Sequence, residues 1–83
     1  MAKYRKEPVV IEAEQWEGAN LNDDNSMFKV PAVIIKSDGS EFVVATLEGV
    51  MTGQLGDWLI RGVKGELYPC KPDIFAATYE PVS

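Results

Sequence analysis

The stretch GDWLIRGVKGELYPCKP, residues 56–72, decides how the chain folds. Two short runs rich in apolar and aromatic residues flank a connection at residues 62–65, whose two glycines can adopt the positive φ of a tight hairpin. Trp58 and Ile60 alternate with their neighbours before the connection, and Leu67 alternates with its neighbours after it. Each run therefore has one face suited to a core, and the stretch predicts a β-hairpin.

Other short runs supply strands that pack against this hairpin. Alternation of apolar and polar residues over residues 9–16 predicts a strand with one solvated side. Two β-branched runs, residues 32–36 and 41–46, flank an Asp-Gly loop at residues 37–40 and give the strongest hairpin signal in the chain. A further turn leads into a strand at residues 50–52. Because these connections are short, neighbouring strands are expected to pair antiparallel.

The C-terminal segment has a different pattern. Pro72 stands at a first-turn position with Asp73 beside it, and apolar residues then recur at helical spacing. This predicts a helix of about two turns, followed by an extended piece over residues 79–82 against the sheet. The predicted fold class is mainly β with one short helix: a small antiparallel meander of five or six strands, curled into a half-open barrel that the helix closes.

Size and composition describe one small domain, residues 1–83, with a basic N-terminal arm at residues 1–7 and a polar surface loop at residues 18–28. A domain of this size buries only about 60–65% of the surface of its unfolded chain, so forming a homo-oligomer would add stability. No apolar run approaches the ~18 residues of a membrane span, and the apolar run after the basic arm is too short for a signal peptide. We therefore expect a cytoplasmic protein without membrane contact.

Charge and residue usage exclude several functions. The net charge of −5 argues against general nucleic-acid binding, which normally needs a basic surface. The single cysteine, Cys70, rules out an internal disulfide, which fits a reducing compartment. Because the sequence has no histidine, it can build neither an ordinary zinc site nor a Cys–His catalytic pair. We expect no catalytic residues, no metal and no cofactor, although Lys71 could lower the pKa of the adjacent Cys70 thiol.

One group of residues in and after the hairpin combines aromatic rings with cations. Such a group can stack on a base or ring and pair with a phosphate. If Arg61 pairs with Glu66 near the turn, Trp58 and Tyr68 lie close together toward the base of the hairpin. The alternative is that both aromatic rings belong to the core and the cations only solvate the hairpin. The candidate binding residues are Trp58, Arg61, Lys64, Tyr68 and Lys71.

Acidic side chains in the first third of the chain offer a second surface. An acidic face could mimic nucleic acid or cover a basic surface of a host protein. For any single charge, a solvated face is the simpler interpretation. The group comprises Glu12, Glu14, Glu17, Asp23 and Asp24.

Three blocks of the sequence carry a resemblance to a family. They are YRKxPVVIEAxQWxG at residues 4–18, TLEG at residues 46–49 and GDWLIxGVKGExYPCKPDIFxxTYE at residues 56–80. They are similar to blocks in a family of short, uncharacterised proteins encoded by tailed bacteriophages and prophages. The match covers both ends of the chain, and residues 19–41 lie outside it. The resemblance implies a phage gene product made in the bacterial cytoplasm, and it carries no catalytic residues.

These observations favour a phage or prophage accessory protein that is not an enzyme and acts by binding a host protein or another phage protein. A first alternative is an oligomeric domain that binds or sequesters a small phosphorylated, nucleotide-like molecule, with Trp58, Arg61 and Tyr68 at its pocket. A second alternative is a minor component of the virion or of its assembly. A third alternative is a small enzyme that uses Cys70.

Overall fold

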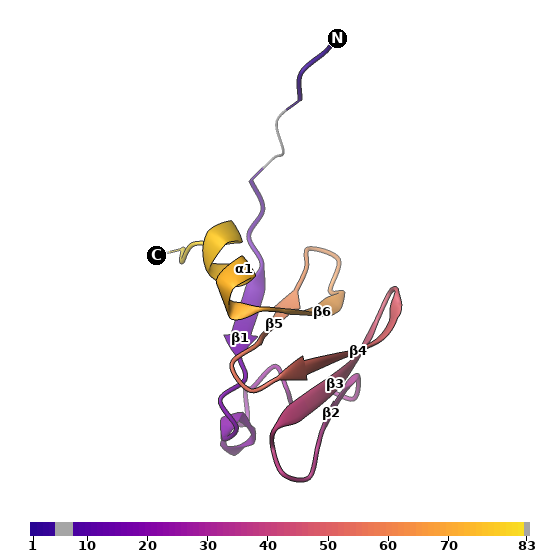
Figure 1. Cartoon of the computed structure of the whole chain (residues 1–83), viewed down its shortest axis with the longest axis vertical. Helices are drawn as coiled ribbons and strands as arrows, with labels where there is room; N and C mark the ends of the chain where they lie inside the picture. Colours follow the sequence, from indigo (N-terminus) through magenta and orange to yellow (C-terminus); the bar gives the residue numbers. More distant parts are fainter. Residues whose placement is uncertain (5–7, 83) are drawn as a thin grey trace.

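The computed structural model describes residues 1–4 and 8–82, so three residues of the predicted basic arm lie outside the described residues. The described chain forms two three-stranded antiparallel sheets and one short helix (Figure 1). In chain order the elements are β1 (Glu12–Gln15), η1 (Asn20–Asn22), β2 (Val33–Ile35), β3 (Glu41–Thr46), β4 (Gly49–Gln54), β5 (Trp58–Arg61), β6 (Leu67–Cys70) and α1 (Pro72–Thr78). The predicted mainly β class with a C-terminal helix is confirmed. The described sheets do not close into a barrel, which agrees with a half-open arrangement.

The first sheet has the order β1-β5-β6 and contains the predicted hairpin. Gly65 adopts a φ of +80°, as a tight turn requires, and the Gly62 N–H donates to the Glu66 carbonyl at 2.8 Å. Gly62, unlike Gly65, does not have a positive φ. A Cβ there would overlap the Glu66 carboxyl group, which folds back over the turn and accepts a hydrogen bond from the Lys64 N–H at 3.1 Å.

The second sheet, β2-β3-β4, contains the hairpin with the Asp-Gly loop, as predicted. The Asp38 carboxylate accepts hydrogen bonds from the Ser40 N–H and hydroxyl, and Gly39 takes a φ of +76°. Across the β3–β4 pair, Phe42 lies opposite Gly53, and a Cβ on this glycine would overlap the Phe42 ring. The glycine therefore gives the ring its place in the core.

The chain passes from one sheet to the other between β4 and β5. The prediction that neighbouring strands pair is wrong at this step, because the Asp57 carboxylate accepts a hydrogen bond from the Gln54 N–H and Gly56 adopts a φ of +93°. These two features end β4 and turn the chain away from it. β5 pairs instead with β1, whose Glu12 lies opposite Arg61.

One core lies between the sheets. Trp16, Phe28 and Phe42 form an aromatic cluster with ring centroids 4.9–6.5 Å apart. The first sheet adds Leu59 to this core, and the second sheet adds Val44. The Trp16 indole N–H also donates to the Gly39 carbonyl at 2.8 Å, so the fully buried ring is held to the second sheet.

The segment predicted as a polar surface loop, residues 18–28, is exposed over most of residues 18–25 but not at its end. Ser26, Met27 and Phe28 are buried, and Phe28 belongs to the aromatic cluster. The surface-loop prediction is therefore wrong for these three residues. The polar residues at the start of this segment suggested that all of it is exposed, but a core this small needs the Phe28 ring.

The helix α1 covers the outer face of the first sheet (Figure 1). Phe75 stacks on Trp58 with a centroid distance of 3.9 Å and an interplanar angle of 7°. Residues 79–82, predicted as an extended piece against the sheet, form no strand, but Tyr79 has extended backbone and its hydroxyl lies 3.3 Å from that of Tyr68 on β6. None of the described helices is long and apolar enough to span a membrane.

Candidate functional site

The structure does not bring the five predicted binding residues together. Because Trp58 lies opposite Cys70 and Ile60 lies opposite Tyr68, these four side chains share the sheet face that α1 covers. Arg61 belongs to the opposite face of β5. Lys64 lies at the hairpin tip, and Lys71 follows the end of β6. The described positions therefore do not form one aromatic and cationic site.

The predicted pairing of Arg61 with Glu66 is also wrong. Arg61 lies opposite Leu67 in the hairpin and pairs instead with Glu12 across the β1–β5 contact, with Nη1 and Oε2 3.3 Å apart. The two partners are separated by 49 positions in sequence. The ion pair is largely exposed, so its contribution to the free energy of unfolding is small.

Trp58 and Tyr68 contact α1 and the residue after it. Trp58 stacks on Phe75, and the Tyr68 hydroxyl lies 3.3 Å from the Tyr79 hydroxyl. Burial, aided by the hydrogen bond with Tyr79, raises the pKa of Tyr68 to about 12. The two aromatic rings thus dock the helix, which is closer to the core interpretation than to a ring-stacking ligand site.

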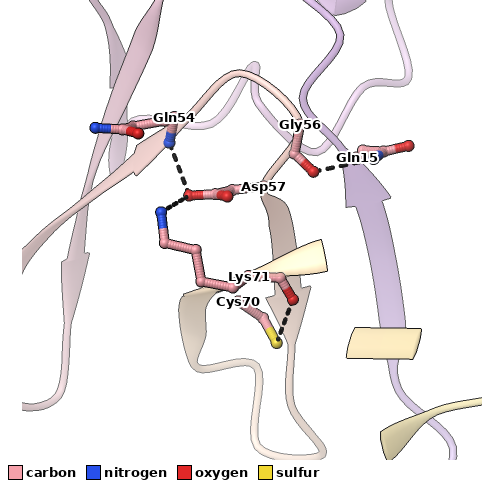
Figure 2. A network of polar contacts seen from close by, with 6 residues as sticks. All are labelled: Gln15, Gln54, Gly56, Asp57, Cys70 and Lys71. Atoms are coloured by element: carbon pink, nitrogen blue, oxygen red, sulfur yellow. Dashed lines mark hydrogen bonds and ion pairs between the residues drawn. The ribbon is translucent and has the colours of Figure 1, made fainter. Parts of the chain in front are cut away.

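Lys71 has a structural partner. Figure 2 shows its ammonium group and the Gln54 N–H converging on one oxygen of the buried Asp57 carboxylate, each at 2.9 Å. This arrangement ties the end of β6 to the turn that separates the two sheets. Lys71 is therefore engaged in holding the fold together.

Cys70 is next to Lys71, but its thiol is not activated. Burial raises the pKa of the Cys70 thiol, and the Asp57 and Asp73 carboxylates raise it further. The expectation that Lys71 lowers this pKa is wrong, since its ammonium group is directed to Asp57 (Figure 2). A protonated thiol is a poor nucleophile.

An apolar groove of about 850 Å³ lies between the chain before β1 and the C-terminal end of the molecule. One wall is the extended segment of residues 8–11, and the other is formed by α1 with residues 79–82. Trp58 and Ala13 also line the groove. Val10 is 71% exposed here and Val82 is 74% exposed, so both present apolar surface to solvent. We call this feature the apolar groove.

A second hollow of about 520 Å³ shares Ala13 and Trp58 with the apolar groove. Three carboxylates line it, from Glu14, Glu17 and Asp23, and none of them lies in an ion pair with a described cation. We call it the acidic hollow. Of the predicted acidic face, Glu12 pairs with Arg61 instead, and Asp24 pairs with Lys29 at 3.1 Å.

Glu14 has a second role. Its carboxylate accepts hydrogen bonds from the Ser26 hydroxyl at 2.6 Å, the Asn20 amide at 2.7 Å and the Met27 N–H at 3.0 Å. These contacts draw the loop after β1 back over the strand.

Within the described part of the chain, no group of three or more acidic or cysteine side chains is placed to hold a metal ion.

Of the described residues that line the apolar groove, Trp58 alone was among the predicted binding residues, and the apolar segment of residues 8–11 was not. Their signal was available, because the run Pro8-Val9-Val10-Ile11 is apolar on both faces of a segment predicted to have one solvated side. Its partner surface, residues 79–82, could not be inferred from local pattern because the two segments are about 70 positions apart.

Comparison of the chain with protein-family models, with curated proteins and with solved structures found no match.

Proposed function

We propose that this chain is a phage- or prophage-encoded accessory protein of the bacterial cytoplasm that acts without catalysis, by binding a host or phage protein. The observation that carries the proposal is the apolar groove, which is lined by exposed aliphatic side chains and by the half-buried, stacked rings of Trp58 and Phe75. Open apolar surface of this kind is typical of sites where another chain docks. The phage origin is supported by the three sequence blocks alone.

Binding of a nucleotide-like molecule has less support. A phosphate site needs converging cations or backbone N–H groups. Arg61 and Lys71 are instead paired with Glu12 and Asp57 on different parts of the molecule, and no cation is found among the described residues that line the apolar groove. A protein segment with apolar side chains fits this groove better than a phosphorylated ligand.

The test is an affinity pull-down from the bacterial host, with wild type compared with Val10→Asp. Val10 is exposed in the apolar groove, so a carboxylate there should leave the fold intact and repel an apolar partner. The matched control is Val63→Asp, at the hairpin tip, where Val63 is 67% exposed. Mass spectrometry should show one protein captured at a fixed ratio by wild type and by the control, and at least tenfold less by Val10→Asp.

Two outcomes contradict the proposal. Equal capture by Val10→Asp and wild type would remove the groove from the interaction. A native mass that shows only the chain would contradict binding of a protein, and a homo-oligomer with added small-molecule mass would favour the sequestering alternative.

A further inference from the structure

β1 is an edge strand. In the part of the chain that the structure describes, it pairs with β5 on one side only, and the apolar groove and the acidic hollow follow one another along it, since both include Ala13 and Trp58. The segment before β1 continues the strand direction in Figure 1. Among the described residues, neither Val9 nor Val10 forms a backbone hydrogen bond with another segment. Unpaired backbone beside apolar surface is a template for an added strand.

The free edge has a defined end. The side-chain Nδ2 of Asn20 donates to the Gln15 carbonyl at 2.8 Å, and the side-chain Oδ1 of Asn20 accepts from the Glu17 N–H at 2.7 Å. These contacts occupy the backbone groups that follow β1, so strand addition cannot continue past Gln15. The end of the free edge coincides with the acidic hollow.

The acidic residues of the hollow favour a positively charged group of the partner at this place. Glu14, Glu17 and Asp23 all line the hollow, and no described cation is paired with them. A lysine or arginine side chain entering beside Trp58 would meet carboxylates and an aromatic ring together, which favours a cation.

We propose that the partner segment is an extended peptide that adds a strand along residues 8–14, with aliphatic or aromatic side chains in the apolar groove and a lysine or arginine at the acidic hollow. This inference rests on the proposed binding function and specifies its partner chemistry. Main-chain hydrogen bonds supply affinity in such complexes, and the side-chain pockets supply specificity. The cation is placed at the end of the peptide that lies beside Gln15.

The experiment is selection from a random library of eight-residue peptides displayed on yeast, using the full chain as the target. The selected peptides should carry apolar residues followed or preceded by a lysine or arginine at one end. For a selected peptide, Glu17→Lys combined with Asp23→Lys should raise Kd at least tenfold at low ionic strength, and the difference should shrink at high salt. Both replaced residues are exposed, so the variant should fold.

The control for charge is Asp24→Lys combined with Glu48→Lys, which changes the net charge equally at exposed positions outside the hollow. This control should leave Kd within about twofold of wild type. Hydrogen exchange tests strand addition directly. The bound peptide should slow the exchange of backbone amides in residues 9–13 at least tenfold.

Selected peptides without a basic end, equal affinity of the two double variants, or unchanged exchange in residues 9–13 would each overturn the inference. An empty selection would overturn it as well. These failures are distinguishable from failure of the proposed function, because loss of capture by Val10→Asp in the pull-down would still establish a protein partner in the groove.

Discussion

At the scale of single residues, Glu14 connects the first strand to the loop that follows it. Its two carboxylate oxygens accept three hydrogen bonds from Asn20, Ser26 and Met27. In Glu14→Gln, an NH₂ group replaces one carboxylate oxygen. This new donor then faces hydrogen-bond donors of the loop and leaves at least one of them without an acceptor. We expect the free energy of unfolding to fall by about 1–3 kcal/mol, as measured by urea denaturation.

The same variant should speed hydrogen exchange at the Met27 amide, because that N–H loses a charged acceptor. Glu17→Gln is the matched control, since Glu17 is exposed and lies three positions along the chain. Its free energy of unfolding should stay within about 0.5 kcal/mol of wild type. Equal effects of the two variants would show that the Glu14 contacts do not hold the loop.

The sequence predicted residue faces better than residue partners. Alternation correctly places Trp58 and Ile60 on one face of β5, because side-chain direction in a strand follows from the backbone alone. The partner of Arg61 was wrong because Glu12 comes from a strand 49 positions away. The predicted site is dispersed for the same reason, because two of its cations, Arg61 and Lys71, are paired with acids that no local pattern reveals.

At the scale of elements, the contact between Tyr68 on β6 and Tyr79 after α1 makes the docking of the helix sensitive to alkali. The folded state holds the pKa of Tyr68 at about 12, whereas an unfolded tyrosine titrates near 10. A raised pKa in the folded state means that stability is complete below pH 10 and is lost as the pH rises toward 12.

We expect wild type to lose about 1 kcal/mol of unfolding free energy between pH 9 and pH 11 through this group. Tyr68→Phe should lose correspondingly less over the same interval, although it is less stable at pH 9 because Tyr79 loses its hydroxyl partner. Tyr4→Phe is the control, since Tyr4 is 95% exposed. Chemical denaturation at the two pH values measures the difference, and identical pH dependence in all three proteins would refute it.

Elements that are set by residues close together in sequence, such as turns and a helix start, were predictable. Strand pairings between segments far apart in sequence were not. The Asp38-Gly39 loop specified the β2–β3 hairpin, and Pro72 specified the start of α1. The separation of β4 from β5 depends on Asp57, whose carboxylate is fixed by Gln54 and Lys71. Nothing in a short turn sequence distinguishes a turn within a sheet from one that leaves it.

At the scale of the whole molecule, the two sheets share one core. Trp16, which follows β1, packs on Phe42 of the other sheet, and Leu59 joins the same cluster. Neither sheet of three strands buries an apolar face by itself. We therefore expect urea unfolding to give one transition, with coincident midpoints from far-ultraviolet circular dichroism and tryptophan fluorescence.

Separate transitions for the two probes would contradict the shared core. A useful control is Leu47→Ala in the β3–β4 turn, where Leu47 is 86% exposed, because it should leave the midpoint and its coincidence unchanged. A core substitution such as Val44→Ala should move both probes together by about 1–3 kcal/mol, since the methyl groups it removes are fully buried.

The placement of the two tryptophans has an optical consequence. Trp16 is 1% exposed inside the shared core, whereas Trp58 lies where the apolar groove and the acidic hollow meet. One indole therefore senses whether the chain is folded, and the other senses what occupies its surface. With one of them replaced by phenylalanine, the same 83 residues become a label-free sensor of either folding or docking.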